Sequence, residues 1–386
     1  MKIIHVCLAC FYVEGMGYQE NILPKNHSRE GHNVTVITSD FAFNTKGEKI
    51  TKDKECYINN AGVTVKVIQR KSGIFFKKFG AFDGLYNEIA CINPDIIFVH
   101  GGQFISLRDI IKYKKKHTDV RLYIDQHGDF YNMPLTTFKS QFIQKVIYGH
   151  YLRKAVKYCN KFWGVTPWRC QYLHEVYGIP KNKIGLLVMG GDDDYIDISH
   201  QGDIRKNIRN GLHLSEEDFV LITGGKIDKT KNIHYLMQAI KDLNINDLKL
   251  IVFGQPNDEM ETVIEELSKD IHIKYIGWLP STSVYDYFLA SDLAVFPGTH
   301  SVLWEQAAAC GIPLVVNEWE GMHHIDIGGN CKFLKGDDVD ELKYNVENIY
   351  RDKVLYQNML SVAKEKGVSM FSYRNIAKRA IEEKDE

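Results

Sequence analysis

The sequence predicts an α/β protein made of two Rossmann-like, doubly wound domains with mostly parallel sheets. Short apolar runs alternate with longer helical patterns from one end of the chain to the other, and this order is typical of a parallel sheet covered by helices. The pattern starts afresh in the second half, so we expect two similar units and not one long sheet. With 386 residues, 44% of them hydrophobic, the chain can fill two cores.

Seven apolar runs in the first half are predicted as strands, because several are rich in β-branched residues and end at Gly, Asp, Ser or His. They are residues 3–8, 34–38, 63–68, 96–100, 122–125, 162–165 and 186–189, and the second half adds 220–223, 250–253, 273–276, 293–296 and 314–316. Between the two sets, residues 190–218 are polar and begin with Gly and Asp, which favour turns. We place the boundary near residue 195, which gives domains of residues 1–195 and 196–370.

Charge and composition exclude several classes of partner. The 48 basic and 49 acidic side chains give a formal charge of -1, so a global field that would draw the protein to nucleic acid is excluded. No apolar run approaches the roughly 18 residues that a membrane span needs, and the first residues show no cleavage site. Eight cysteines over this length are no disulfide scaffold. We therefore expect a cytoplasmic protein.

The end of the first strand carries a candidate phosphate site. Ligands of doubly wound sheets bind beyond the carboxyl ends of the strands, so two such domains that face each other form one cleft. Gly15 and Gly17 follow the first strand and precede a helical stretch, where backbone N–H groups can approach a phosphate closely. Because Glu20 occupies the place of the third glycine in G-x-G-x-x-G, an NAD enzyme is disfavoured.

His127 follows the fifth strand and is flanked by carboxylates and glycine. Such a histidine can hydrogen-bond a substrate hydroxyl, with its orientation fixed by an acidic neighbour. A structural turn histidine is the alternative, and the residues around it leave both interpretations open.

The first strand of the second half ends at a loop with two glycines and three lysines, among them Gly225, Lys226 and Lys231. A lysine is a compact point charge and glycine allows close approach of the backbone, so this strand-to-helix turn suits a diphosphate. Solvated surface lysines are the alternative, which the clustering at a strand end makes less attractive.

A second loop, residues 296–301, leads into a helix that bears Glu305. Ser301 is a plausible N-cap, and Glu305 lies one turn further along on the side that faces the loop. A carboxylate there can accept hydrogen bonds from sugar hydroxyls. A surface glutamate is the alternative, although its flanks are unusually apolar.

Several motifs in order resemble one family. They are Gly15–Gly17, residues 30–38, residues 125–128, the loop 225–232, residues 276–278, residues 292–298 and residues 305–313. Together they resemble the GT-B glycosyltransferases, specifically the retaining family 4 (glycosyl transferases group 1), over nearly the whole chain. The resemblance implies two Rossmann-like domains facing across a cleft, with acceptor binding in residues 1–195, donor binding in residues 196–370, and a helix in residues 371–386 that crosses back to the first domain.

The resemblance also implies the roles of individual residues. The catalytic set is His127, Lys226, Lys231 and Glu305. Both lysines would neutralise the donor diphosphate, Glu305 would hold the ribose hydroxyls, and His127 would contact the reacting sugar. The donor-binding positions are Gly15, Gly17, Gly225, Gly277, Trp278, Leu279, Gly298, Thr299, His300, Ser301 and Val302.

The implied reaction is the transfer of a sugar from a nucleoside diphosphate sugar, expected to be a UDP-sugar, to an acceptor hydroxyl with retention at the anomeric carbon. The acceptor would be a saccharide or a lipid-linked saccharide of surface polysaccharide or glycoconjugate biosynthesis. A nucleotide-sugar 2-epimerase and a catalytically silent nucleotide-sugar binder are the alternatives. The second becomes conceivable through a departure at Pro297, where the family has the first of two glutamates.

A second departure from the family concerns charge. The family usually has Arg where Lys226 stands, so a bidentate clamp becomes a single point charge. Asp192, Asp193 and Asp194 are reminiscent of a metal-binding D-x-D motif, but their position matches the linker of the family. Because two lysines already supply the charge of a divalent ion, we expect no metal and no other cofactor.

Two basic segments suggest contact with the inner face of a membrane. Segment 75–79, with Phe75 and Phe79 at its ends, interleaves aromatic and basic residues, and segment 112–116, from Lys112 on to Lys116, adds a basic run. Each lysine near an anionic surface contributes about 1 kcal/mol. Solvated loop and helix faces are the alternative.

Overall fold

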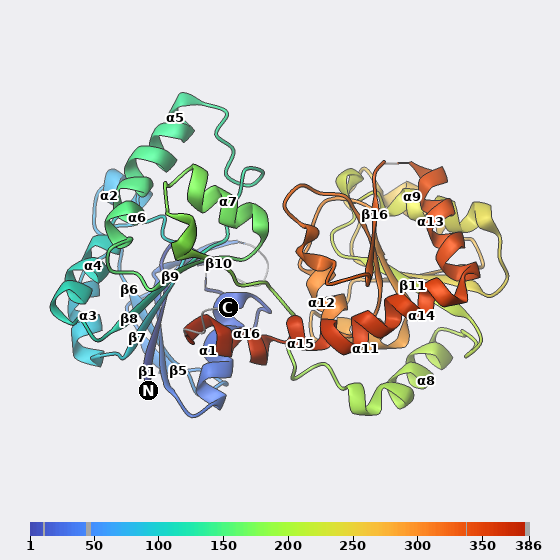
Figure 1. The fold of residues 1–386 in the computed structure, drawn as a ribbon, viewed down its shortest axis with the longest axis horizontal. Helices are drawn as coiled ribbons and strands as arrows, with labels where there is room; N and C mark the ends of the chain where they lie inside the picture. The colour runs from blue at the N-terminus through green and yellow to red at the C-terminus, as the bar shows by residue number, and fades with distance from the viewer. Residues whose placement is uncertain (11, 44–47, 337, 383–386) are drawn as a thin grey trace. The chain divides into compact units, whose positions relative to one another are not determined.

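The computed structural model describes residues 1–10, 12–43, 48–336 and 338–382. Residues 383–386 of the predicted C-terminal helix lie outside the described residues. The chain divides into two compact units, Met1–Val188 with Ile376–Glu386, and Met189–Asn375 (Figure 1). The division therefore falls at the start of the polar segment in which the sequence changes from apolar runs to turns.

The first unit contains a mostly parallel sheet. In the described part of the chain its strand order is β10-β9-β8-β7-β1-β2-β6-β5, and the β5–β6 pair is antiparallel. The strands are β1 (Lys2–Cys7), β2 (Asn33–Ser39), β5 (Cys56–Ile58), β6 (Thr64–Ile68), β7 (Ile96–His100), β8 (Arg121–Gln126), β9 (Lys161–Gly164) and β10 (Ile184–Leu186), and β3 (Phe41–Phe43) pairs with β4 (Lys49–Thr51) in a separate hairpin. The central strands are buried on both faces, as strands of a covered parallel sheet must be.

Helices of the first unit lie on both sides of this sheet, with α3 and α4 on one side and α1 and α16 on the other (Figure 1). The helical segments are α1 (Gln19–Arg29), α2 (Ile74–Lys78), α3 (Leu85–Ile92), α4 (Leu107–Lys116), α5 (Phe138–Gln141), η1 (Phe142–Tyr148), α6 (Gly149–Ala155), α7 (Pro167–Glu175), η2 (Lys181–Lys183) and α16 (Tyr373–Ile381). Apolar residues of the covered faces form one core that includes Ile97, Val99 and Phe104.

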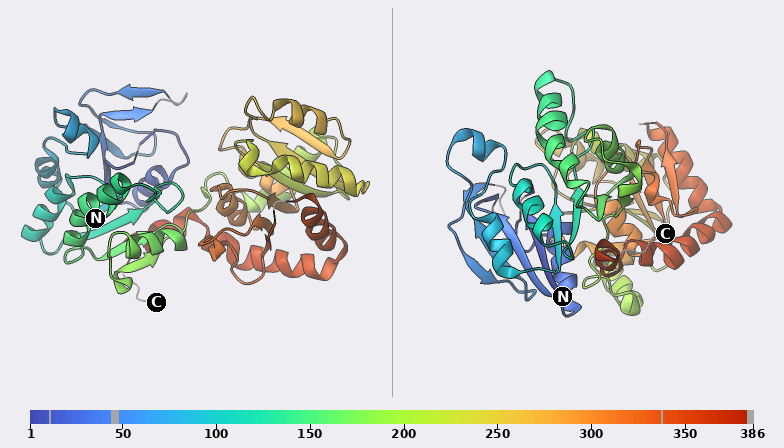
Figure 2. Two further views of the ribbon diagram at one scale, coloured as in Figure 1. Left: turned by 90° about the horizontal axis from the view of Figure 1, so that it is seen from above. Right: turned by 60° about the vertical axis from the view of Figure 1, so that its left-hand side comes forward.

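The second unit is a parallel sheet with the order β13-β12-β11-β14-β15-β16 among the described residues. Its strands are β11 (Phe219–Gly224), β12 (Leu248–Phe253), β13 (Ile273–Gly277), β14 (Leu293–Phe296), β15 (Leu314–Asn317) and β16 (Cys331–Leu334). Its helical segments are η3 (Ile198–His200), α8 (Gln201–Gly211), η4 (Lys229–Lys231), α9 (Ile233–Leu243), α10 (Glu261–Leu267), α11 (Val284–Ala290), α12 (Leu303–Ala309), η5 (His323–Ile325), α13 (Val339–Arg351), α14 (Lys353–Val362), η6 (Ala363–Gly367) and α15 (Val368–Met370). Two further views show its helices around the sheet (Figure 2).

The predicted fold class of two parallel α/β sheets is confirmed, while one strand is displaced. The apolar run 186–189 was predicted as a strand, but β10 is Ile184–Leu186. Leu187 and Val188 are fully buried and continue beyond the strand toward the second unit. The Leu187 amide still donates to the Gly164 carbonyl of β9 at 2.9 Å, so the apolar run combines the end of this pairing with burial.

Candidate functional site

The candidate donor site of the second unit lies where β11 ends. Gly225 follows this strand with a φ of 110°, and Gly254 follows β12 with a φ of 121°. A Cβ atom on Gly254 would lie 1.8 Å from the carbonyl oxygen of Gly225. Since a side chain cannot occupy that space, the two strand ends approach each other because both positions are glycine.

A second contact joins the loop after β11 to the loop after β14. A Cβ atom on Gly298 would lie 2.3 Å from the carbonyl oxygen of Thr230 and 2.4 Å from Cα of Lys231. The Thr299 amide donates to the Thr230 carbonyl over 3.0 Å, and Asn232 Nδ2 donates to the Pro297 carbonyl over 3.3 Å. These contacts hold the two loops of the predicted donor site in one surface.

Lys231 lies inside this surface. Its Nζ donates hydrogen bonds to the carbonyl oxygens of Thr299 at 2.7 Å and His300 at 3.2 Å. Burial lowers the pKa of Lys231. The ammonium lines a small pocket whose other described residues are Thr223, Gly224, Ile233, Phe296, Pro297, Gly298, Thr299, Ser301 and Trp304. A fixed cation in a glycine-lined pocket suits a phosphate oxygen.

Lys226 is placed differently from Lys231. Its side chain is 74% exposed, and its Nζ forms an ion pair with Asp228 at 3.3 Å. Asp228 in turn accepts from the Thr230 amide at 3.0 Å. The structure thus brings Lys231 into the pocket and leaves Lys226 at the surface of the same loop.

Glu305 is fully buried on α12. Its Oε1 lies 2.9 Å from His300 Nε2 and 3.0 Å from His324 Nε2, while no described residue is a partner of Oε2. Burial opposes the charged form of Glu305, but His300 and His324 outweigh it and hold its pKa well below the usual value. The carboxylate is therefore ionised, with one oxygen left without a partner.

His324 was not predicted from the sequence. It belongs to η5, which follows β15, and its side chain is 2% exposed. The only sequence signal is its place after a parallel strand, which many structural residues share. The loop after β15 thus adds a residue to the site that the motifs around Glu305 do not contain.

The remaining donor-site residues lie around these loops. Gly277 ends β13 with a φ of 70°, and its carbonyl accepts from the Gly254 amide at 2.7 Å. The neighbouring Trp278 is 67% exposed, and Leu279 is half-buried. The predicted N-cap of α12 at Ser301 is wrong, because the helix begins after Val302, without a side-chain cap. Ser301 faces the pocket beside Lys231 instead.

In the first unit, His127 follows β8 and its side chain is 32% exposed. Its Nε2 lies 3.2 Å from Oδ2 of the fully buried Asp125. Burial opposes protonation of His127, but the negative charge of Asp125 outweighs it and raises the pKa of His127. Gly15 has a φ of 80°, and neither it nor Gly17 has a neighbour within 4 Å of an added Cβ. Both glycines therefore lie in open space before α1.

The ligand atoms of His100, Asp125 and His127 lie within 4.8 Å of one another. His100 Nδ1 is 2.8 Å from Asp125 Oδ2, the length of a charge-assisted hydrogen bond. In this structure the three side chains are joined by contacts of hydrogen-bond length through Asp125 Oδ2.

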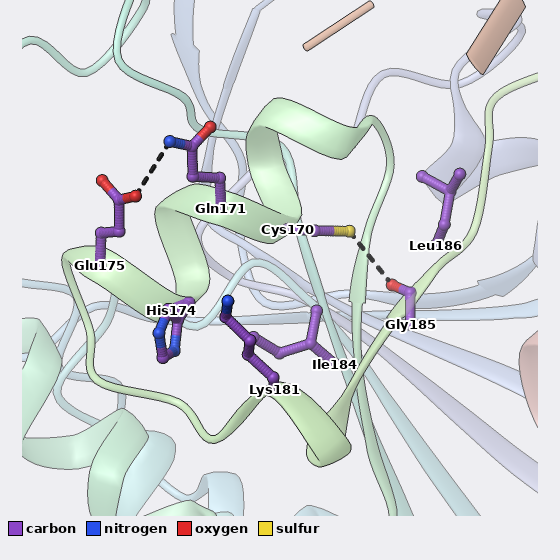
Figure 3. Close-up of a pocket in the computed structure, with 8 residues that line it drawn as sticks. All are labelled: Cys170, Gln171, His174, Glu175, Lys181, Ile184, Gly185 and Leu186. Carbon is purple, nitrogen blue, oxygen red and sulfur yellow. Dashed lines mark hydrogen bonds between the residues drawn. The ribbon is translucent and has the colours of Figure 1, made fainter. Parts of the chain in front are cut away.

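Two pockets of the first unit lie outside the predicted donor positions. One, of about 440 Å³, lies between α7 and β10 and is lined by Cys170, Lys181 and Gly185 among others (Figure 3). In it Gln171 Nε2 donates to Glu175 at 2.9 Å. The other, of about 360 Å³, lies at the carboxyl ends of β1 and β2 and contains Arg70, Lys77 and Lys78.

Comparisons with known proteins give a consistent result. Residues 204–366 match the family model described as Glycosyl transferases group 1. The chain is 21% identical over 215 residues to an uncharacterized glycosyltransferase of Methanocaldococcus jannaschii, covering 53% of this chain and 55% of that protein. It is 23% identical over 194 residues to lipopolysaccharide 1,2-N-acetylglucosaminetransferase of Salmonella typhimurium, covering 46% and 51%. The chain thus spans about half the length of these curated relatives.

Solved structures are similar over nearly the whole chain. HepE of Anabaena in complex with UDP has a TM-score of 0.67 at 15% identity and covers 98% of both chains. WaaG, a glycosyltransferase involved in lipopolysaccharide biosynthesis, has a TM-score of 0.60 at 14% identity and covers 98% of this chain and 99% of its own. The chain therefore has the GT-B fold, and its second unit carries a domain of the glycosyl transferases group 1 type.

Proposed function

We propose that this protein is a retaining glycosyltransferase of family 4 that transfers a sugar from a UDP-sugar to an acceptor hydroxyl in polysaccharide or glycoconjugate biosynthesis. The observation that carries the proposal is the pair of joined loops after β11 and β14, with Lys231 fixed beside a glycine-lined pocket and Glu305 ionised behind it. A similar structure holds UDP, and a relative is a lipopolysaccharide N-acetylglucosaminetransferase.

In this proposal Lys231 stabilises the leaving diphosphate, because a preorganised cation acts on charge that grows as the glycosidic bond breaks. Glu305 accepts hydrogen bonds from the ribose hydroxyls through the oxygen that has no described partner. Lys226 is an exposed point charge on the loop, paired with Asp228. Gly277, Trp278 and Leu279 are the base contacts. The diphosphate itself takes the acceptor proton.

In the first unit, Gly15 and Gly17 leave the backbone before α1 open to a phosphate. His127 donates to or accepts from a hydroxyl of the reacting sugar, and Asp125 holds the ring. Thr299 and Ser301 are the candidates for reading the donor sugar in place of the glutamate that Pro297 replaces, because both line the pocket, whereas His300 is bound to Glu305.

The proposal is tested with UDP-, GDP- and dTDP-sugars. The enzyme should release nucleoside diphosphate, slowly without an acceptor, and Lys231→Ala should lower the rate roughly 10²-fold or more, as does the loss of one preorganised donor elsewhere. Lys229→Ala is the matched control, since Lys229 lies on the same loop, is 66% exposed and pairs with Glu259. Equal rates for the two variants would contradict the role of Lys231.

Metal independence is a separate prediction. Because lysines supply the positive charge at the diphosphate, EDTA should leave the rate of nucleoside diphosphate release unchanged within twofold, and added manganese should not raise it. Loss of activity in EDTA with recovery in manganese would show that the donor needs an ion.

None of the helices in the described part of the chain combines the length and the apolar character that a membrane span requires. Peripheral contact with an anionic membrane through segments 75–79 and 112–116 is part of the proposal. The lysine side chains of the second segment lie over tyrosine rings, with Lys112 and Lys116 at 5.0 and 5.7 Å from the ring centre of Tyr86. In the first segment Lys78 likewise lies 5.6 Å from the ring centre of Phe79.

A further inference from the structure

The pocket at the carboxyl ends of β1 and β2 has a positively charged lining. Arg70, Lys77 and Lys78 line it, and none of its described lining residues is acidic. Arg70 is fixed by a 2.8 Å ion pair with Asp40 behind the pocket. Neither Lys77 nor Lys78 forms an ion pair with a described residue, and both are exposed. Two uncompensated ammonium groups therefore remain for a ligand.

An apolar surface adjoins these charges. Helix α2, which carries both lysines, also exposes Ile74 by 89%, Phe75 by 56% and Phe76 by 42%. Large apolar side chains gathered beside cations are the combination that binds an amphiphile with an anionic head. We propose that this basic pocket binds the phosphate or diphosphate group of a lipid-linked acceptor, with α2 against its hydrocarbon chain. The proposal rests on the proposed transferase function and names its acceptor class.

Binding of farnesyl diphosphate, measured by calorimetry, tests this assignment. It should bind more tightly than inorganic diphosphate, which lacks the chain, and than farnesol, which lacks the charge. Replacing both Lys77 and Lys78 by Gln should weaken the binding of farnesyl diphosphate at least tenfold. The matched control, Lys112→Gln with Lys116→Gln, should leave this binding unchanged. Equal effects of the two pairs, or equal binding of farnesol, would overturn the assignment.

The release of nucleoside diphosphate in the absence of an acceptor distinguishes a failure of the basic-pocket proposal from a failure of the transferase proposal. Replacing Lys77 and Lys78 should not change this release, because neither residue belongs to the proposed donor-binding positions. A variant pair that binds farnesyl diphosphate normally would refute the basic pocket even in an active enzyme, whereas an inactive wild type that still binds it would refute only the transferase function.

An independent observation is a chain of buried histidines that runs to Asp125, the partner of His127. His27 Nε2 is 2.8 Å from the Ala377 carbonyl of α16, and His27 Nδ1 is 3.0 Å from His5 Nε2. His5 Nδ1 is 3.0 Å from His100 Nε2, and His100 Nδ1 is 2.8 Å from Asp125 Oδ2. All four side chains are fully buried. We call His27, His5 and His100 the histidine relay.

Counting hydrogens fixes the charge of this set. Each of the four contacts needs one hydrogen, because two lone pairs cannot face each other at 2.8–3.0 Å. Ala377 can only accept, so His27 Nε2 carries a hydrogen. Three neutral imidazoles supply three hydrogens and an ionised Asp125 supplies none. The four contacts therefore require one hydrogen beyond the three that neutral imidazoles supply. This additional proton balances the negative charge of Asp125, so the relay and the carboxylate together are electrically neutral, which suits complete burial.

The surroundings favour one place for the additional proton. Burial lowers the pKa of His5 well below its usual value and that of His27 to about 4, so both rings are neutral. Burial also opposes ionisation of Asp125, but His127 and His100 outweigh it and lower its pKa. The hydrogen count therefore places the additional hydrogen on the contact between His100 Nδ1 and Asp125 Oδ2, whose 2.8 Å length is that of a charge-assisted hydrogen bond.

Asp125 Oδ2 faces two imidazoles, His100 on one side and His127 at 3.2 Å on the other. We infer that the histidine relay consists of positioning residues: its additional proton competes with His127 for the charge of Asp125 and so sets the proton affinity of His127. The other charged groups that act on His127 are Glu20 of α1 and Arg169 of α7, and Arg169 is itself paired with Asp129 at 3.1 Å.

Two histidines of the relay offer a matched pair of variants. His5→Leu removes two contacts, so that the additional hydrogen is no longer needed and Asp125 keeps its full charge toward His127. His27→Gln preserves the relay, since an amide can donate to Ala377 and accept from His5 Nε2. Near the far end, His32 also acts on His27, with its ring centre 6.3 Å away, and it stays in place in both variants.

Titration of His127 by NMR tests the relay without any turnover. His5→Leu should raise the pKa of His127 by about one unit or more, as expected for an opposite charge no longer shared, and His27→Gln should leave it unchanged. Unchanged titration in His5→Leu would overturn the inference. Should that variant not fold, ¹⁵N spectra of the wild type decide, because both ring nitrogens of His100 should carry hydrogen at pH 7, and a neutral His100 ring would overturn it equally.

Discussion

Glu305 is a buried carboxylate whose ionisation depends on two imidazole groups. His300 comes from the loop before α12 and His324 from the loop after β15, and both meet the same oxygen, Oε1. The sequence predicted Glu305 from its helix position, but its burial and its second partner follow from the way that β14 and β15 lie side by side. The sequence could therefore identify the carboxylate, but not the two imidazole groups that keep it ionised.

The low pKa of Glu305 predicts how stability depends on pH. Because its pKa is lower in the folded protein than in the unfolded chain, its charge stabilises the fold above about pH 4.3, and this contribution is lost as the pH falls below that value. Glu305→Gln should be less stable than the wild type at pH 7 by roughly 1–3 kcal/mol. The difference should shrink toward pH 3 in urea unfolding experiments. A difference that is the same at both pH values would contradict this account.

At the scale of elements, the two strand-to-helix loops of the second unit depend on Gly298. Any Cβ there would collide with backbone atoms of the neighbouring loop, at 2.3 Å from the Thr230 carbonyl. Sequence patterns predicted both loops and their glycines, because turns after strands have a clear composition. They did not predict that the loops touch, since that depends on β11 and β14 being neighbours in the sheet.

Gly298→Ala should displace one loop from the other. We expect a loss of about 1–3 kcal/mol of stability, as in other overpacked sites, and a lower rate of nucleoside diphosphate release because Lys231 shifts. Gly202→Ala is the control, since a Cβ there meets no atom within 4 Å and lies in α8. That variant should be neutral or slightly more stable. Thermal unfolding and the rate of nucleoside diphosphate release are measured for both variants. The prediction is wrong if Gly298→Ala behaves like Gly202→Ala in both measurements.

At the scale of the whole molecule, α16 returns the chain to the first unit. Arg121 Nη1 and the Tyr123 hydroxyl donate to the Ile381 carbonyl at 2.9 and 3.2 Å, and Trp163 Nε1 donates to the Ala380 carbonyl at 3.2 Å. Ile376 and Ala377 are fully buried there. The first unit thus includes two segments from opposite ends of the sequence.

Removal of residues 371–386 should lower the thermal unfolding temperature. The three donors above and His27 would lose their acceptors, and the apolar surface under α16 would meet water. Lys378→Gln is the control, because its 3.5 Å ion pair with Glu30 is largely exposed and such pairs contribute little. An unchanged unfolding temperature after the deletion would show that α16 does not stabilise the first unit.

The sequence by itself determined the two parallel α/β sheets, because alternating buried strands and amphipathic helices leave a periodic signal in the chain. It missed β3, β4, β5 and β16, which are three or four residues long. It also determined the glycines and lysines of the donor loops, which follow strand ends. Only the tertiary structure decided that Lys231 is fixed and Lys226 exposed, that His324 joins Glu305, and that His27, His5 and His100 form a chain that ends at Asp125. These contacts join neighbouring strands in space, and no local pattern records which strands are neighbours.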